Sequence, residues 1–432
     1  MRERGLANLR AAKALFEEAI QRDPLYANAY SGLADAYYLL IYNHAQELEL
    51  GERLGAQAAN RAIELDPTSS EAHASRANFA LWRYDDHGDV QQLERAIADY
   101  QRAIELDPSN AEAHHWYGDA VEESGDPDRA LRLYERAVEL DPLMRQAQLA
   151  AARVIASRGE YDKARRQITQ VIDRYPDFAD AYNLAGFVDW QNGHLVEARS
   201  WFKKAYELEP DPTTALVVYQ TSAQLGDRVT AAEWLPRIAG VPYLERYVEA
   251  EQLSTEGKYP QALEAVMHLE FDENWAIHAV WAAHLALLVG HPERATAILL
   301  KEYPELAKDE SPITQFNCGA AIALAASWQR TNQRPEADRL LRRTAVFLDS
   351  PRAPRVLLAG EAGAYAVGDA RAYARAQVHA LLGEPDQAFS ALDRAFNEGR
   401  RGVNSIWCYR GEDDPLFDSI RSDPRFKACG ES

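Results

Sequence analysis

The chain has 432 residues, of which 47% are hydrophobic and 26% charged, so it can bury a large core and is not an intrinsically disordered chain. Its 67 acidic residues outnumber 47 basic ones and give a net charge of −20, which argues against binding nucleic acid or an anionic membrane through bulk charge. Its three cysteines form no CxxC pair, so we expect neither a disulfide framework nor a cysteine zinc site.

The N-terminal residues predict an amphipathic helix. The segment 1–20 begins with basic residues, as a signal peptide does, but Lys13, Glu17 and Glu18 interrupt its apolar run. No partner helix precedes it, so a partner, a second copy or a missing upstream segment should cover its apolar face. A fragment of a longer protein is therefore one interpretation. The longest apolar stretches, 276–290 and 319–328, fall short of the roughly 18 residues that cross a bilayer, and we predict a cytoplasmic protein.

Prolines divide the next part of the chain into repeats. They close helical runs at Pro24, Pro67, Pro108, Pro142, Pro176 and Pro210, and the last three intervals are each 34 residues long. Within 111–142, Gly118, Gly125, Ala130 and Tyr134 occupy the eighth, fifteenth, twentieth and twenty-fourth positions, and Gly186, Gly193, Ala198 and Phe202 occupy them within 179–210. The spacing predicts a helix, a tight turn at the fifteenth position, a second helix and a proline stop. Small residues at the eighth and twentieth positions let the paired helices approach, while the aromatic residue fills the space between repeats.

These residues resemble the tetratricopeptide repeat (TPR) family from about residue 11 to 210. His114, Gln148 and Tyr182 stand where the family has tryptophan, and this loosens single repeats without changing the architecture. The resemblance implies an all-α, right-handed superhelical solenoid of about nine to ten helix-turn-helix repeats, ending in a capping helix.

We expect two parts in this solenoid. A regular array covers 1–242, with its first helix unpaired and inserts near 41–54 and 83–92. A degenerate array covers 243–432, where turn residues persist but the prolines are displaced; a break falls at 349–368, and the capping helix covers 415–426. The expected turns of the later repeats lie at Gly226, Gly257, Gly290, Asn332 and Gly383.

The C-terminal residues also resemble the TPR tails of bacterial winged-helix regulators, nucleotide cyclases and Ser/Thr kinases. The matching residues are Leu381, Leu382, Gly383, Asp386, Ala388, Pro415, Phe417, Asp418, Arg421, Asp423, Pro424, Arg425 and Phe426. This resemblance implies the sensor or interaction half of a signalling protein. A short cap on the last repeat explains the same residues.

Catalytic motifs are absent from the sequence. It contains no GxxxxGK[ST], GxGxxG, HExxH, GxSxG or kinase catalytic loop, so we expect no enzyme activity and no cofactor. His114 and His115 point about 100° apart on one helix and cannot readily share a metal ion. The acidic residues around Gly88 lack the order of an EF-hand and predict a solvated turn, and no metal site is expected.

TPR proteins bind protein segments through helix positions 2, 5, 9, 12 and 13, which line a concave groove. The resemblance places sixteen residues there: Asn28, Tyr38, Asn78, Trp82, His115, Asp119, Glu122, Glu123, Arg153, Asn183, Phe187, Trp190, Gln191, Thr221, Tyr247 and Glu251. The Lys and Asn of the family's carboxylate clamp are missing, because Ser31 and Asp35 occupy those positions in the first repeat. The alternative is that Trp82, Phe187 and Trp190 pack in the core.

We therefore predict a non-catalytic scaffold that binds a protein or peptide in this groove, more readily a basic or apolar partner than an acidic one. It would be the interaction part of a bacterial signalling or transcription regulator. The alternative is a regulatory or oligomerising arm of a fused or separate cyclase or kinase, and a homo-oligomer stays an open alternative. A stand-alone enzyme is the third hypothesis.

Overall fold

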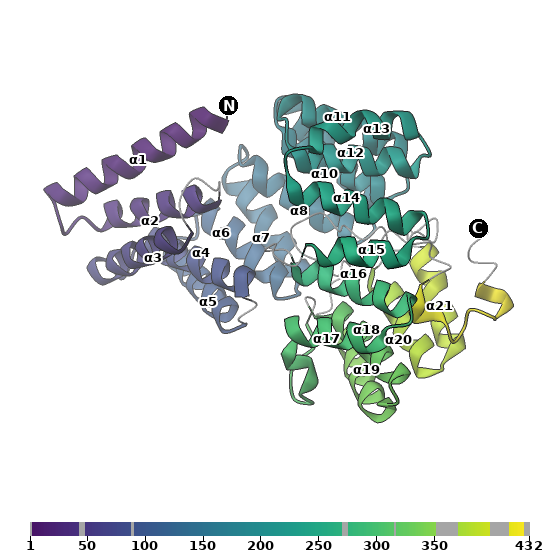
Figure 1. Ribbon diagram of the computed structural model, residues 1–432. Coiled ribbons are helices and arrows are strands. Elements are labelled where there is room, and N and C mark those ends of the chain that lie inside the picture. Colours follow the sequence, from purple (N-terminus) through teal and green to yellow (C-terminus); the bar gives the residue numbers. More distant parts are fainter. Residues whose placement is uncertain are drawn as a thin grey trace. The chain divides into compact units, whose positions relative to one another are not determined.

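The computed structural model describes residues 2–42, 48–87, 90–269, 275–314, 317–350, 370–397 and 414–426 (Figure 1). Every regular element in these ranges is helical. Helix α1 comes first, and ten pairs of helices follow it in chain order, from α2 and α3 to α20 and α21. The predicted all-α solenoid of paired helices is confirmed.

The chain forms two compact units, residues 1–154 and 155–432. Unit 1 contains α1 (Arg2–Arg22), α2 (Ala27–Tyr42), α3 (Leu48–Leu65), α4 (Ser70–His87), α5 (Val90–Leu106), α6 (Ala111–Glu123), α7 (Pro127–Leu140) and most of α8 (Arg145–Ser157). The boundary between the units, after Val154, does not coincide with the boundary near residue 242 between the regular and the degenerate repeats. Repeat regularity is a property of the sequence, whereas the units are defined by packing.

Unit 2 contains the remaining hairpins. Its helices are α9 (Tyr161–Arg174), α10 (Ala179–Gln191), α11 (Leu195–Leu208), α12 (Pro212–Gln224), α13 (Arg228–Ile238), α14 (Pro242–Thr255), α15 (Tyr259–Met267), α16 (Trp275–Leu288), α17 (Pro292–Glu302), α18 (Cys318–Arg330), α19 (Arg334–Asp349), α20 (Ala370–Leu382) and α21 (Pro385–Asn397). Two 3₁₀ helices, η1 (Pro304–Ala307) and η3 (Pro415–Phe417), complete the described elements.

The turns form where the sequence predicts them. Gly193 has φ +79°, a left-handed conformation that costs glycine nothing, and it ends the first helix of its hairpin. Asn332, the one expected turn residue that is not glycine, has φ +61°, which asparagine tolerates better than most residues. Second helices stop just before the predicted prolines; α7, for example, ends at Leu140 before Pro142.

The helix crossings depend on glycine at the eighth repeat position. A Cβ atom on Gly118 would lie 2.4 Å from the ring of Tyr134, and one on Gly186 would lie 2.5 Å from the ring of Phe202. Both rings are fully buried. The aromatic side chain at position 24 therefore lies directly on the backbone of the first helix, which confirms the predicted small-residue contact.

Helix α1 packs against α2 as a second helix would. The ring of Phe16 lies against Gly32, where an added Cβ would come within 2.3 Å of it, and the Lys13 ammonium lies 5.0 Å from the centre of the Tyr37 ring. Leu15 on the same helix keeps 65% of its surface exposed.

The predicted inserts lengthen helices. Helices α3 and α4 have 18 residues each and α5 has 17, against 13 or 14 in α6 and α7. Insert residues 43–47 and 88–89, and nearly all of the predicted break at 349–368, lie outside the described residues. The capping element at 415–426 is not one continuous helix: it begins with the 3₁₀ helix η3, continues as turns and a bend over 418–423, and is helical again at 424–426.

Candidate functional site

The first helices of the hairpins form a shared surface within each unit. In unit 1, α4 contacts both α2 and α6, and in unit 2, α18 contacts both α16 and α20. We call the side chains at positions 2, 5, 9, 12 and 13 of these helices the A-face. All of the predicted groove residues in unit 1 belong to this face.

An aromatic cluster lies on the A-face of unit 1. The ring of Tyr38 on α2 meets the rings of Phe79, Trp82 and Trp116 edge-on, at centroid distances of 6.0, 6.2 and 5.7 Å. Tyr38 is buried, whereas Trp82 and Trp116 are partly exposed. The indole N–H of Trp82 is buried without a hydrogen-bond partner. The cluster therefore combines an apolar platform with an unused donor.

Three carboxylates lie on the same face of the same three helices. They are Asp35 on α2, Glu71 on α4 and Glu112 on α6. Asp35 accepts a hydrogen bond of 2.6 Å from Ser75 Oγ, and Glu71 accepts one of 3.1 Å from Ser69 Oγ. Burial, together with the charges of Glu112 and Glu71, raises the pKa of Asp35 to about 7, although the hydrogen bond from Ser75 opposes the rise. No ion pair to these three groups occurs within the described part of the chain.

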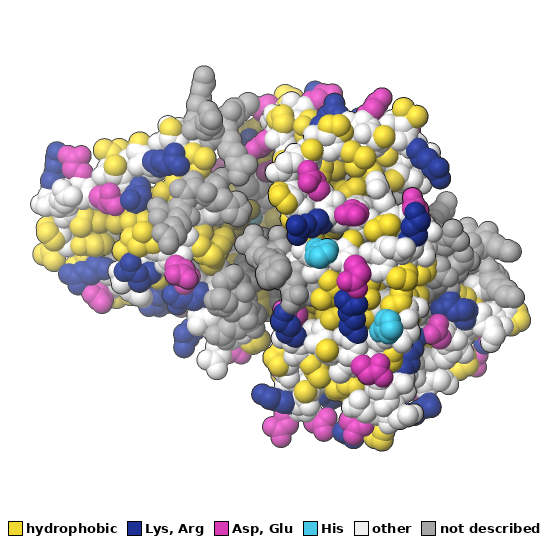
Figure 2. All heavy atoms as spheres, in the orientation of Figure 1, with side chains coloured by type: hydrophobic (Ala, Val, Ile, Leu, Met, Phe, Trp, Pro, Cys, Tyr) yellow, Lys and Arg dark blue, Asp and Glu magenta, His cyan; other side chains and the backbone are white. Residues whose placement is uncertain are grey.

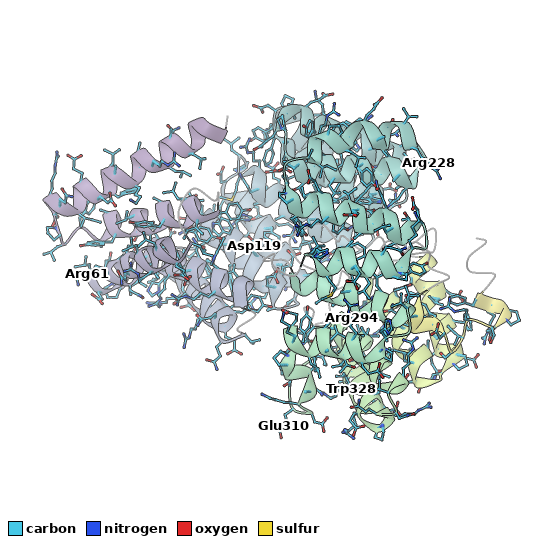
Figure 3. All side chains as sticks on the ribbon, viewed as in Figure 1. Arg61, Asp119, Arg228, Arg294, Glu310 and Trp328 are labelled. Carbon is cyan, nitrogen blue, oxygen red and sulfur yellow. The ribbon has the colours of Figure 1, made fainter. Side chains whose placement is uncertain are left out.

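A second group of carboxylates on this face is neutralised internally. Asp119, labelled in Figure 3, lies 2.5 Å from the hydroxyl of Tyr134, and Glu122 lies 2.9 Å from the same hydroxyl. Arg153 on α8 bonds Glu122 at 2.5 Å and lies 3.8 Å from Asp119. Burial raises the pKa of Glu122, and Arg153 opposes this rise. The network therefore holds α6, α7 and α8 together, and its side chains are also partly exposed to solvent.

The remaining predicted residues of unit 1 differ in their surroundings. Asn28 is exposed, and Glu123 is partly exposed. Asn78 is buried and accepts a hydrogen bond of 2.5 Å from Tyr100. His115 is 8% exposed, its Nδ1 has no hydrogen-bond partner, and burial lowers its pKa. Asn78 is therefore held by the hairpin itself, whereas His115 keeps a free ring nitrogen.

The predicted groove residues of unit 2 pack more deeply. Phe187 and Trp190 stack at 6.2 Å, both contact Phe202 edge-on, and the Trp190 indole donates to Gln224 at 2.9 Å. Asn183 is partly exposed, Gln191 is buried, and the fully buried Thr221 donates to the Val217 carbonyl of its own helix. Tyr247 packs on Trp281 at 5.5 Å, and the buried Glu251 accepts from Gln220 at 3.3 Å.

Sequence reasoning did not place Trp116, Asp35, Glu71 and Glu112 in the site, although it noted Asp35 as a residue that replaces the carboxylate clamp. Trp116 stands at position 6, outside the register used to choose groove residues, yet its ring reaches Tyr38 on α2. Glu71 and Glu112 stand at position 2 of their helices, so the register itself would have found them.

Charge on the visible face is mixed. Figure 2 shows acidic and basic side chains interspersed over the helices, so the net charge of −20 forms no continuous acidic field there. None of the described helices is long and apolar enough to cross a membrane. Within the described residues there is also no group of three or more His, Cys, Asp or Glu side chains that could hold a metal ion.

The comparisons with known proteins agree with this fold. Residues 89–125 match a TPR repeat model, and residues 121–186 and 179–212 match two tetratricopeptide repeat models. The chain thus contains tetratricopeptide repeats. No curated protein matches it.

Several solved structures are similar to part of the chain. YrrB, described as a TPR protein with an unusual peptide-binding site, is 23% identical over 46% of this chain and 95% of its own, with a TM-score of 0.33. PilF from Pseudomonas aeruginosa is 19% identical over 46% of this chain and 88% of its own, with a TM-score of 0.37. PilW, a type IV pilus biogenesis factor, is 19% identical over 50% of this chain and 94% of its own, with a TM-score of 0.42.

Proposed function

We propose that this chain is a protein-interaction scaffold that binds a protein segment on the A-face of unit 1. The observation that carries the proposal is the set of three carboxylates, Asp35, Glu71 and Glu112. Among the described residues they have no ion pair, and they lie on the face that holds the aromatic cluster.

Two other partly buried carboxylates of unit 1 have an arginine beside them. Asp99 pairs with Arg76 at 2.6 Å, and Glu122 pairs with Arg153 at 2.5 Å. Asp35 has no such partner, and its raised pKa shows that its charge is held at a cost. A cation that reached this point would stabilise the ionised carboxylate. The group that fits is a Lys or Arg side chain of a bound segment.

The aromatic cluster defines the other half of the ligand. Trp82 and Trp116 expose ring surface next to Tyr38, and this surface can pack against an apolar side chain. Aromatic anchors of this kind dominate the energetics of many interfaces. We therefore propose a ligand segment that carries a basic side chain close to an apolar one, in agreement with the sequence-based expectation.

The proposal extends to the setting in which the scaffold acts. The C-terminal resemblance supports the interaction part of a bacterial signalling or transcription regulator, in which the effector is a separate domain or protein. A regulatory arm of a cyclase or kinase remains the second candidate, because the same C-terminal residues support it.

Phage display of random dodecapeptides on the full chain tests the binding face without a known partner. Selected peptides should combine Lys or Arg with a neighbouring apolar residue. They should lose affinity for a triple variant, Asp35→Asn, Glu71→Gln and Glu112→Gln. The matched control is Glu49→Gln, Glu94→Gln and Glu135→Gln, which removes three exposed carboxylates from the second helices α3, α5 and α7.

The control should bind the selected peptides as the wild type does. Equal binding to the wild type and the A-face variant would refute the assignment of the site. Selection of acidic peptides would refute the assignment of the ligand.

A further inference from the structure

The C-terminal segment 414–426 lies on the A-face of unit 2. Its 3₁₀ helix η3 contacts α20 and α16, and Arg330 of α18 bonds it as well (Figure 1). The segment comes from outside the repeats, and residues 398–413 connect it to the last hairpin. In unit 1 the corresponding face carries no such segment among the described residues.

Asp414 is the most deeply buried polar group of the segment, with no exposed surface. Its side chain accepts hydrogen bonds from Tyr373 Oη at 2.7 Å and from Gln377 Nε2 at 3.0 Å, both on α20. It also accepts from the backbone N–H of Leu416 at 2.9 Å, which closes the turn at Pro415. A buried carboxylate with three donors is a specific contact, because a residue without those acceptors would leave the donors unpaired.

Further hydrogen bonds engage the backbone and two other polar side chains of the segment. Arg330 donates to the carbonyl of Pro415 at 2.7 Å and also bonds Asp418. Ser419 Oγ donates to the carbonyl of Ala380 at 2.6 Å. The bond to the Pro415 carbonyl recognises the backbone of the segment, whereas the bonds of Asp418 and Ser419 recognise its side chains.

Two apolar side chains anchor the segment. Leu416 and Phe417 are each 1% exposed. Leu416 joins the large core of α14 to α20, and Phe417 joins the cluster of the last hairpin, where it meets the Tyr373 ring edge-on at 5.4 Å. Fully buried anchors next to a satisfied carboxylate are typical of the centre of a specific interface.

The contacting side chains occupy A-face positions. Counted back from the turn at Gly383, Tyr373 and Gln377 stand at positions 5 and 9, and Arg330 stands at position 13 relative to Asn332. These positions correspond to those of His115, Asp119 and Glu123 in unit 1. The segment therefore uses the surface of the repeat that is proposed to bind a partner elsewhere in the chain.

We propose that the A-face of α16, α18 and α20 is a binding site for an Asp-Pro-aliphatic-Phe turn, that the chain's own segment 414–426 occupies it, and that a partner segment of the same chemistry displaces it. The site differs from that of unit 1, because it receives a carboxylate where unit 1 would receive a cation. Because the segment belongs to the same chain as its site, it binds with an intramolecular advantage, so a partner competes only when it exceeds that advantage.

The test uses a fluorescein-labelled peptide with the sequence of residues 412–428, followed by fluorescence anisotropy. The full chain with Asp414→Ala and Phe417→Ala should bind the peptide at least about tenfold more tightly than the wild type, because its own segment no longer competes. Adding Arg330→Ala and Gln377→Ala to that variant should weaken binding at least about tenfold. A peptide with Ala at both the Asp414 and Phe417 positions is the matched control and should not bind.

A second measurement does not depend on the folding of that variant. A protease site placed within 398–413 and then cut leaves every contacting side chain in place. The labelled peptide should then replace the severed segment, which mass spectrometry would detect in the released fraction.

Three results would overturn the proposal. The first is equal peptide binding by the wild type and by the variant with Asp414→Ala and Phe417→Ala. The second is a severed segment that never exchanges, which would make it a permanent part of the core. The third is a dimer of the wild type that the peptide dissociates, which would assign the segment to a second copy of the chain. Failure of the unit 1 site leaves all three measurements unaffected, because they use a different probe and a different face.

Discussion

The substitution Gly186→Ala examines the contact on which the hairpin geometry depends. The new Cβ would lie 2.5, 2.6 and 2.8 Å from three carbon atoms of the Phe202 ring. That ring has no exposed surface and is held edge-on by Phe187 at 4.9 Å and Trp190 at 5.9 Å. It cannot rotate away without moving both neighbours, so α10 and α11 must separate.

The magnitude follows from two opposing effects. Overpacking of a well-packed core costs about 1 to 3 kcal/mol. Replacing glycine by alanine inside a helix gains about 1 kcal/mol. The net loss should be about 0 to 2 kcal/mol. Gly319→Ala is the matched control, because its Cβ would meet only Val280 Cγ1, at 3.8 Å, and no clash opposes the gain.

Hydrogen exchange of the amides in α10 and α11 provides the measurement, since a solenoid responds mainly near the altered repeat. We expect faster exchange there in Gly186→Ala, and unchanged or slower exchange around α18 in Gly319→Ala. In a Phe202→Ala background the ring is gone, so the same glycine substitution should no longer destabilise. If Gly186→Ala stabilised its hairpin as much as Gly319→Ala stabilises α18, the packing argument would be refuted.

Three further predictions concern titratable groups. Arg153→Ala should destabilise unit 1 by about 1 kcal/mol near pH 7, a value discounted for partial exposure. Urea melts should show a smaller loss at a more acidic pH, because burial raises the pKa of Glu122 and a protonated Glu122 no longer needs the Arg153 cation. Equal losses at both pH values would contradict the network. Burial, with the charges of Glu112 and Glu71, raises the pKa of Asp35 from 3.8 to about 7, so the folded state binds this proton more tightly than the unfolded state. The contribution of Asp35 to the free energy of unfolding therefore falls as pH rises between these two values. Asp35→Asn should make the free energy of unfolding depend less steeply on pH in this range, and an unchanged dependence would contradict the raised pKa. Burial raises the pKa of Cys318 to about 12, so iodoacetamide should modify this thiol only after the chain unfolds. Peptide mass spectrometry would show the modification. Rapid modification of the native chain would contradict the burial of Cys318.

The helices and turns were predictable because their signals are local. A proline two residues beyond a helix or a glycine at the fifteenth position acts on its own backbone, whatever the rest of the chain does. Asn332 shows how far this extends: it replaces glycine in a degenerate repeat, yet the turn forms at the expected residue. The small residue at position 8 was equally readable, because Gly118 and Gly186 recur in register with the aromatic residue that covers them.

The candidate site was less predictable, because the register places a side chain on the A-face but does not choose its partner. Asp119 and Asp35 both stand at position 9 of a first helix. Arg153 from α8 reaches the first of these carboxylates, and no cation reaches the second within the described residues. Trp190 and Trp82 differ in the same way. Gln224 on α12 accepts the hydrogen bond of the Trp190 indole, whereas the indole N–H of Trp82 has no partner among the described residues.

The sequence by itself therefore determined the order of the helices, the turns between them and the small and aromatic residues where paired helices cross. These features depend on residues close together in the chain. Tertiary structure alone decided which carboxylates keep an unneutralised charge, which aromatic rings stay accessible and where the C-terminal segment docks. These properties depend on groups about 30 to 90 residues apart, such as Arg330 and Asp418, whose separation in space follows only from the stacking of the hairpins.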